Sequence, residues 1–346
     1  MASPDHLFGL RNSFYIGAYH AAITSSQSVP AHALSPDELV ERDAILYRSY
    51  IAIGSHQVRA RSRPPSPPPL AVGHLDRVTP CRVRTPALGV PTQMPVAAAH
   101  VLTSRTLAMQ LVVGEIGPGA ATALQAVKLL AVYLSGDAGN RESAVSRLRE
   151  LLSDAAIGSN PILRLMAGTI FMHERDYAEA LKHTHSGGNM ELLALNVQIY
   201  LQMHRADHAE KQLRVMQQLD EDHTLTQLAN AWVDLVMGGS KIQEAHLIFQ
   251  DLSEKYPPTC TILNGKALCS MHMGNFEDAE GLLLESLNKD AKDAETLANL
   301  TVCSLNLGKP ATRYLNQLKL VNPEHTLVKR MSSAADSFDR ACQAMA

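Results

Sequence analysis

Aromatic side chains are scarce in this 346-residue chain. Phe, Trp and Tyr together make up 5% of the sequence, whereas hydrophobic residues as a whole make up 46%. The interior must therefore be built largely from small and aliphatic side chains, and Ala, Leu, Met and Gln are abundant, as is typical of packed helices. The composition predicts an all-α fold.

Cysteine pairs with metal-site or disulfide spacing are also missing. None of the five cysteines forms a C-x-x-C pair, and nothing indicates a secretory context, so neither a zinc site nor a disulfide framework is predicted. Cys269 and Cys303 lie 34 residues apart. This spacing indicates equivalent positions of a repeat, where a buried thiol acts as a small hydrophobic group. The cysteines are Cys81, Cys260, Cys269, Cys303 and Cys342.

The chain has no excess of positive charge and no long apolar run. Its 31 Lys and Arg residues face 34 Asp and Glu residues, for a net charge of -3, whereas chains that neutralise many phosphates are usually strongly basic. Nucleic acid is therefore not expected as a partner. No segment approaches the roughly 18 apolar residues of a membrane span, and MASPDHLFGL is unlike a signal peptide. We expect a soluble, cytosolic chain that reaches membranes only through its partners.

Motifs for catalysis and nucleotide binding are absent from the sequence. Neither Gly187-Gly188 nor Gly238-Gly239 is part of a phosphate loop, and GEIGPGAAT does not fit a dinucleotide fingerprint. No nucleophile elbow occurs either. We therefore predict that the chain is not an enzyme, with no catalytic residue and no cofactor.

Two histidine pairs were considered as metal ligands. His204 and His208 are four residues apart but straddle a predicted turn, and no third ligand or HExxH pattern accompanies them. His183 and His185 precede a glycine pair that is typical of a helix end. The interpretation favoured here is surface histidines at turns, without a metal site.

The positive signal in the sequence is a repeat of about 34 residues. Met273-Gly274 recurs as Leu307-Gly308, 34 positions later, and five alanines in predicted second helices are separated by 36, 29, 36 and 34 residues. This period is that of the tetratricopeptide repeat, a helix-turn-helix unit. The sequence predicts a tetratricopeptide-like right-handed α-solenoid. The five alanines are Ala144, Ala180, Ala209, Ala245 and Ala279.

The residues that follow these alanines have the expected packing chemistry. Ala245 is followed by Phe249 and then Pro257, and Ala279 is followed by Leu283. An alanine lets two helices approach closely, and the larger side chain one turn later fills the groove between repeats. We predict that Ala144, Ala180, Ala209, Ala245, Phe249, Pro257, Ala279 and Leu283 are repeat-packing positions. Upstream, SPDE offers Ser35 as N-cap and Glu38 as its capping-box partner, which predicts a helix from Pro36 towards Gln57.

The repeat pattern is interrupted between residues 58 and 110. This segment has seven Arg, nine Pro and neither Lys nor Glu. Proline-rich sequence cannot propagate a helix and offers few apolar contacts, so we predict a disordered Pro/Arg-rich insertion. Residues 1–57 are then an N-terminal helical repeat region, and residues 111–346 continue the same solenoid.

The ends of this segment suggest how it arose. Val58 requires a codon beginning with GT and Gln110 can be encoded by CAG, which are the two ends of a spliced intron. Removing the segment joins GSHQ to LVVGEIG, so that the second helix of a repeat would continue. Our hypothesis is a translated retained intron or a gene-model error. The alternative is a ligand for a polyproline-binding domain, because Arg61, Pro64 and Pro67 fit a basic PxxP pattern.

A ladder of asparagines gives a candidate binding groove. Asn196, Asn230, Asn264 and Asn299 are spaced by 34, 34 and 35 residues and fall in predicted first helices, which line the concave face of such a solenoid. Their amides could bind an extended segment in the groove, or they could bond internally to neighbouring helices. A clamp for a terminal carboxylate would also need nearby cations, and only Lys266 is available.

Longer blocks of the sequence resemble one family. FYIGAYHAAI at 14–23, LQAVKLLAVYL at 124–134, LALNVQIYLQMHRADHAEKQL at 193–213, DEDHTLTQLANAWVDL at 220–235 and LGKPATRYLNQLK at 307–319 look like the epsilon subunit of coatomer, in a plant-type form. The ending SFDRACQAM also fits. The resemblance covers nearly the whole chain except residues 58–110, which depart from the family pattern.

This resemblance implies a non-enzymatic subunit of the COPI vesicle coat. Its partner would be the alpha subunit of coatomer, which it would bind and stabilise in Golgi-to-ER and intra-Golgi transport. It would be found in the cytoplasm and, as a peripheral component, on Golgi membranes and COPI vesicles. The alternative is a generic tetratricopeptide co-chaperone or scaffold that binds a peptide in its concave groove.

Overall fold

The computed structural model describes residues 5–55, 109–135, 138–185, 188–323 and 325–345. No β-strand occurs in these ranges, so the fold is all-α, as predicted. The helices are α1 (Phe8–Tyr15), α2 (Tyr19–Ser28), the 3₁₀ turn η1 (Ala31–Ala33), α3 (Pro36–Ser55), α5 (Thr122–Ser135), α6 (Ala138–Ser153), α7 (Pro161–His173), α8 (Tyr177–Thr184), α9 (Met190–Gln202), α10 (Ala206–Leu219), α11 (Thr224–Met237), α12 (Lys241–Lys255), α13 (Cys260–His272), α14 (Phe276–Lys289), α15 (Ala294–Asn306), α16 (Thr312–Val321) and α17 (Thr326–Met345).

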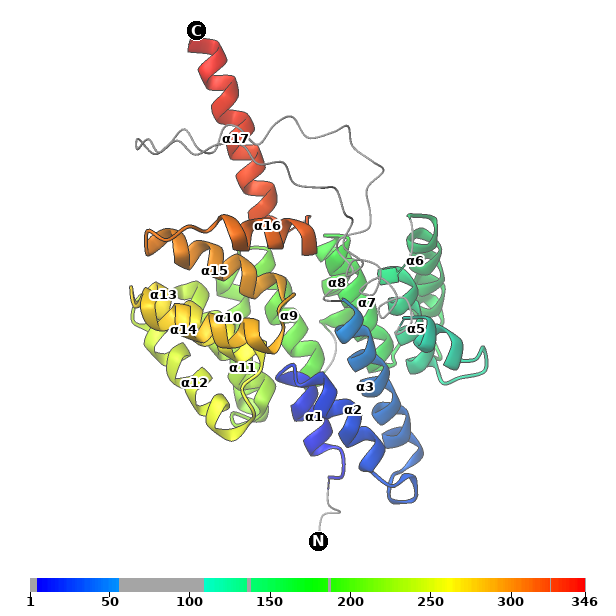
Figure 1. The fold of residues 1–346 in the computed structure, drawn as a ribbon. Helices are drawn as coiled ribbons and strands as arrows, with labels where there is room; N and C mark the ends of the chain where they lie inside the picture. Colours follow the sequence, from blue (N-terminus) through cyan, green and yellow to red (C-terminus); the bar gives the residue numbers. More distant parts are fainter. Residues whose placement is uncertain (1–4, 56–108, 136–137, 186–187, 324, 346) are drawn as a thin grey trace, which may run out of the picture.

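Consecutive helices form pairs that stack on one another. Each of α5, α7, α9, α11, α13 and α15 packs against the helix that follows it, and most first helices of neighbouring repeats also touch. The five predicted alanines lie at these helix pairs, and each is at most 2% exposed. Side chains this small allow close approach of paired helices. The arrangement is a tetratricopeptide-like α-solenoid (Figure 1).

Local sequence signals account for several helix ends. The Ser35 backbone N–H donates to Glu38 Oε2 at 2.8 Å, and the Glu38 N–H donates to Ser35 Oγ at 3.3 Å. The predicted capping box at the start of α3 is therefore confirmed. Pro257 follows the end of α12 at Lys255, where a helix cannot continue through a proline ring.

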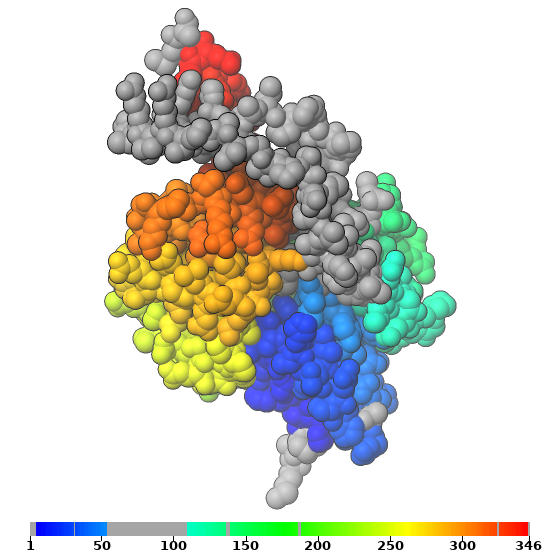
Figure 2. Space-filling model, in the orientation of Figure 1, coloured from blue at the N-terminus to red at the C-terminus, as the bar shows by residue number. Residues whose placement is uncertain are grey.

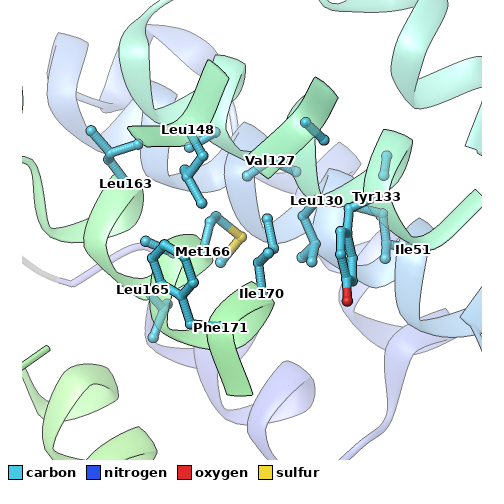
Figure 3. Packing of buried hydrophobic residues seen from close by; sticks show 14 of the residues in the cluster. Ile51, Val127, Leu130, Tyr133, Leu148, Leu163, Leu165, Met166, Ile170 and Phe171 are labelled. Carbon is cyan, nitrogen blue, oxygen red and sulfur yellow. The ribbon is translucent and has the colours of Figure 1, made fainter. Parts of the chain in front are cut away.

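The largest group of buried side chains lies in the first half of the solenoid. It joins α3, α5, α6, α7 and α9 around Val127, Leu148, Ile170 and Phe171, and aliphatic side chains dominate it (Figure 3). Phe171 is 1% exposed and the other three are fully buried. This contact between elements makes the early repeats one continuous core.

The predicted insertion at residues 58–110 lies outside the described residues, except for its last two. Met109 and Gln110 belong to a helix at 109–115, and Met109 is 2% exposed. The predicted boundary is therefore two residues too late, because the Met109 side chain packs into the core. Helix 109–115 lies beside α3, where the Tyr47 hydroxyl donates to Glu115 Oε2 at 3.2 Å. It is a separate helix rather than a continuation of α3.

The N-terminal helices pack against a distant part of the chain. Ile16, at the end of α1, is 1% exposed and belongs to the same cluster as Leu228 on α11 and Ile262 on α13. In Figure 2 the blue N-terminal residues meet the yellow surface of the later repeats directly. The concave side of these repeats is therefore covered in part by the chain's own N-terminus.

The last helix extends away from the body of the molecule (Figure 1). Leu327 and Val328, in the first turn of α17, pack against α15 and α16, whereas Phe338 further along is 67% exposed. Among the residues that the structure describes, no helix combines the length and apolar character needed to span a bilayer.

Candidate binding cavity

A cavity of about 750 Å³ lies between the N-terminal helices and the later repeats. We call it the inner cavity. The turn from α1 to α2 lines one side, and α11, α13, α15 and the loops between them line the others. Its lining comprises Gly17, Ala18, Tyr19, His20, Ala21, Ile53, Trp232, Leu235, Pro258, Thr259, Cys260, Thr261, Asn264, Gly265, Leu268, Lys289, Asp290, Lys292, Asp293, Glu295 and Asn299.

The N-terminal wall of the inner cavity depends on a left-handed glycine. Gly17 has φ +82° and reverses the chain between α1 and α2, a conformation that L side chains rarely adopt. Next to it, the Thr259 hydroxyl donates to the Ile16 carbonyl oxygen at 2.5 Å. These two features hold Tyr19, the first residue of α2, at the cavity wall.

The apolar wall comes mainly from α11 and α13. Trp232 and Leu235 on α11 and Leu268 on α13 line the inner cavity, and Trp232 is half-buried. The sequence predictions did not single out these residues. A usable signal was present, because Trp232 is the only Trp of the chain and lies two residues after Asn230 on the same helix.

The polar wall is a connected network of hydrogen bonds. The Asn299 amide nitrogen donates to Asn264 Oδ1 at 3.0 Å, and the Asn264 amide nitrogen reaches Asp293 Oδ2 at 3.0 Å and Thr296 Oγ1 at 2.8 Å. Thr296 is fully buried, and Asn264 and Asp293 are 8% and 6% exposed. Because its partners are buried, the half-buried Asn299 amide is held in one orientation at the cavity surface.

The asparagine ladder is thus only partly exposed to the inner cavity. Asn264 and Asn299 line it, but Asn196 is fully buried and bonds to Thr184 of α8, whose hydroxyl lies 2.5 Å from Asn196 Oδ1. Asn196 therefore hydrogen-bonds to a neighbouring helix and cannot contact a segment bound in the groove. Asn230 is half-buried on α11 and does not line the cavity.

Charges of both signs line the inner cavity. Lys289 and Lys292 lie at the turn from α14 to α15, together with Asp290, Asp293 and Glu295. Lys266, two residues after Asn264 in the sequence, instead donates to Gln250 Oε1 of α12 at 2.5 Å and is not part of the lining. A surface of mixed charge is better suited to a polar chain segment than to a carboxylate group alone.

Two titratable side chains that line the inner cavity, Tyr19 and Cys260, have pKa values raised by burial. Burial raises the pKa of the Cys260 thiol, which donates to the Ser286 carbonyl oxygen. Burial also raises the pKa of the Tyr19 hydroxyl. Both groups therefore stay protonated at neutral pH and are available for packing and hydrogen bonding.

The two histidine pairs lie at helix ends, as expected. His204 has φ +58° in the turn between α9 and α10, and the His208 ring stacks on Tyr200 with centroids 5.2 Å apart. The His183 ring stacks on Phe171, and His185 caps the end of α8. Within the described ranges, no group of three or more His, Cys, Asp or Glu side chains could hold a metal ion.

The sequence of the chain is similar to those of one protein family. The family profile described as "Coatomer epsilon subunit" matches residues 3–76 and 103–346. "Coatomer subunit epsilon-2" of Oryza sativa subsp. japonica is 70% identical over 345 residues, covering 99% of this chain and 98% of that protein. "Coatomer subunit epsilon-1" of Arabidopsis thaliana is 58% identical over 346 residues, covering 100% and 99%.

Solved structures share the fold at low sequence identity. A tetratricopeptide repeat protein from Parabacteroides merdae aligns with a TM-score of 0.52 and 14% identity, covering 68% of this chain and 92% of that one. The APC/C hetero-tetramer Cut9-Hcn1 gives a TM-score of 0.50 at 14% identity, covering 92% and 61%. These similarities support the tetratricopeptide-like fold.

Proposed function

The chain belongs to the coatomer epsilon-subunit family, and on this premise we propose that it binds the alpha subunit of the coat and stabilises it. Members of this family are structural components of a vesicle coat. The chain is accordingly a scaffold of the COPI coat and not an enzyme.

The same proposal includes where the protein works. We place it in the cytoplasm and, within assembled coats, on Golgi membranes and vesicles in Golgi-to-ER and intra-Golgi transport. Contact with the membrane would be indirect, through the other coat subunits. The membership of the family supports this assignment, and the described helices offer no apolar span of their own.

The inner cavity is the feature that best supports partner binding. It combines an apolar wall around Trp232 with the oriented Asn299 amide, so it offers both apolar contact area and a hydrogen-bonding group. Sites that bind chain segments use this combination of affinity and orientation. We propose that a segment of the alpha subunit occupies the inner cavity, with its backbone paired to Asn299.

A generic co-chaperone is the second candidate. It would need cations grouped around Asn264 and Asn299, whereas Lys266 is bound to Gln250 and acidic side chains accompany Lys289 and Lys292. The mixed charge disfavours this function. Binding of a peptide through its C-terminal carboxylate, in place of the alpha subunit, would support the co-chaperone function instead.

The test is co-elution of the purified full-length chain with the C-terminal domain of the alpha subunit on size exclusion, followed by titration calorimetry. A stable one-to-one complex is expected. Asn299→Ala removes one oriented hydrogen-bonding group, and we expect the dissociation constant to rise about fivefold, corresponding to about 1 kcal/mol.

Asn306→Ala is the matched control on the same helix. Asn306 is exposed and its amide donates only to the Val302 carbonyl oxygen, so its loss should leave the affinity unchanged. No complex with the wild-type chain would overturn the proposed partner. Equal affinities for the two variants would move the binding site away from the inner cavity.

A further inference from the structure

Residues 5–55 form a unit with its own small core. Leu7, just before α1, packs together with Leu10 of α1, Ala22 of α2 and Ile45 of α3, and the first three are fully buried. Arg11 of α1 also pairs with Glu41 of α3 at 2.6 Å. We call residues 5–55 the N-terminal unit. Its internal contacts would hold α1, α2 and α3 together if the unit moved.

The N-terminal unit is attached to the rest of the molecule in two ways. On one side, Ala44 and Ile51 of α3 continue into the large core that contains α5 and α7, as expected for consecutive repeats. On the other side, the unit reaches helices more than a hundred residues away in sequence. We call this second set the closing contacts.

The closing contacts include polar pairs and a small apolar patch. The Thr224 hydroxyl donates to Asn12 Oδ1 at 2.8 Å, and the Thr259 hydroxyl donates to the Ile16 carbonyl oxygen. Arg48 of α3 pairs with Glu191 of α9 at 3.0 Å, with side chains only 13% and 16% exposed. The apolar patch consists of Tyr15, Ile16 and Ala18, of which Ile16 is 1% exposed.

One buried polar group at the closing contacts has no hydrogen-bond partner in the part of the chain that the structure describes. The Asn12 amide nitrogen is buried and has no hydrogen-bond partner among the described residues. A buried donor without a partner favours any state in which water reaches it. If the unit swung away, the Thr224, Thr259, Arg48 and Glu191 groups would be hydrated as well, so the open state would leave none of these groups both buried and unpaired.

The closing contacts also complete the inner cavity. Gly17, Ala18, Tyr19, His20, Ala21 and Ile53, all in the N-terminal unit, form one wall, and α11, α13 and α15 form the opposite walls. Separation of the unit from α11 and α13 would therefore widen the access to the cavity. Closure would cover whatever segment lies inside.

We propose that the N-terminal unit is a gate, which pivots on the packing of α3 against α5, opens at the closing contacts to admit a partner segment, and closes over it. This inference rests on the proposed function for the identity of the partner. The movement itself is a property of this chain alone. Rigid-body rotation of one unit about a packed interface is an established form of conformational change.

A disulfide can lock the gate. A Cβ built on Gly17 would lie 3.7 Å from the Cβ of Thr261, within the range of about 3.5 to 4.5 Å that a disulfide bridges. The variant is G17C/T261C in a C260S background, because Cys260 adjoins the new site. Reduced and oxidised forms of the same protein are compared, and T261C/C260S, which cannot form the bridge, is treated identically.

The first readout needs no partner. Trp232 is the only Trp and lines the inner cavity, so acrylamide quenching of its fluorescence reports cavity access. We expect the quenching constant to fall at least twofold when G17C/T261C is oxidised and to stay unchanged in T261C/C260S. Equal quenching in the reduced and locked forms would overturn the gate.

The second readout is the rate of association with the C-terminal domain of the alpha subunit. We expect the locked form to associate at least tenfold more slowly than the reduced form, and a complex locked after assembly to dissociate at least tenfold more slowly. Equal association rates would overturn the gate even if quenching changed. If the reduced form binds no alpha subunit, the proposed function fails, and quenching alone still decides whether the unit opens.

Discussion

Five inter-helix turns each place one residue in the left-handed region of backbone conformation. They are Gly17, Arg175, His204, Gly274 and Gly308, with φ between 58° and 84°. In each turn the next backbone N–H donates to a carbonyl oxygen five residues earlier, as from Asn275 to Ser270 and from Arg205 to Tyr200. This is the Schellman pattern, which satisfies the last carbonyl groups of a helix. Three of the five turns use glycine, and two use a residue with a Cβ.

His204→Gly should stabilise the protein. A Cβ in the left-handed region costs about 1 to 2 kcal/mol, and the greater flexibility of glycine in the unfolded chain offsets about 0.4 to 1 kcal/mol of this. The expected gain in the free energy of unfolding is about 0.5 to 1 kcal/mol, measured by urea denaturation. The His204 side chain is exposed, so little packing is lost.

Gly274→Ala is the reciprocal control in the equivalent turn between α13 and α14. Gly274 has φ +84° and nothing lies within 4 Å of an added Cβ, so the substitution tests backbone strain alone. It should lower the free energy of unfolding by about 1 kcal/mol. A loss of stability in His204→Gly would contradict this account of the turns.

At the scale of elements, the contact between α12 and α13 shows how a repeat packs. The Phe249 ring of α12 is fully buried, and it lies directly over Gly265 of α13. A Cβ on Gly265 would lie 2.5 Å from Phe249 Cε1 and 2.8 Å from Cε2. The glycine therefore makes room for the large side chain that follows Ala245 by one turn.

Gly265→Ala should destabilise the protein by about 1 to 3 kcal/mol, because the added Cβ would overlap carbons of the fully buried Phe249 ring. Helix propensity alone predicts a gain in the free energy of unfolding, because alanine is favoured over glycine in a helix by about 1 kcal/mol. Thermal and urea denaturation of the variant decide between the two.

Gly281→Ala on the neighbouring helix α14 is the control for propensity. Gly281 is exposed, and an added Cβ would have nothing within 4 Å. We expect a gain of about 0.5 to 1 kcal/mol. Stabilisation by both substitutions would show that the Phe249 ring yields and that the contact is not tightly packed.

At the scale of elements, local sequence patterns predict helix ends but not the burial of every repeated residue. The capping box of Ser35 and Glu38 and the end of α12 before Pro257 follow from residues within one helical turn of each other. The burial of Asn196 cannot be predicted from such local residues, because it depends on Thr184 of the preceding helix pair. A regular spacing of asparagines identifies equivalent positions, but the neighbouring repeat decides which amides reach a surface.

At the scale of the whole molecule, residues 56–108 connect the N-terminal unit to the later repeats. The helices on either side of residues 56–108 contact each other, through Tyr47 and Glu115 and through the core that contains Ile51 and Val112. The segment between them is therefore not needed to bring these helices together. We keep the hypothesis that it is a retained intron, to be tested by sequencing the transcript.

Deletion of residues 58–108 should leave the fold intact. Helical content should be unchanged, and the free energy of unfolding should not fall, because a shorter connection loses less entropy on closure. The deleted chain should co-elute with the C-terminal domain of the alpha subunit as the full chain does. Circular dichroism and size exclusion provide the measurements.

Deletion of residues 58–112 is the matched comparison. It also removes Met109 and Val112, which are 2% and 0% exposed in the core, and should lower the free energy of unfolding by more than about 2 kcal/mol. If the shorter deletion already abolished helicity, the segment would be part of the folded domain, and the intron hypothesis would be wrong.

The sequence by itself determined the helical class, the repeat period, the buried alanines and the capping box of α3. Each of these depends on residues within one repeat, so a pattern of 3.6 or about 34 residues is enough to reveal it. Only the tertiary structure decided that Ile16 packs on α11 and α13, that Asn264 orients Asn299, and that a cavity lies between them. These contacts depend on the curvature of the solenoid, which accumulates from small rotations between repeats and leaves no periodic signal in the sequence.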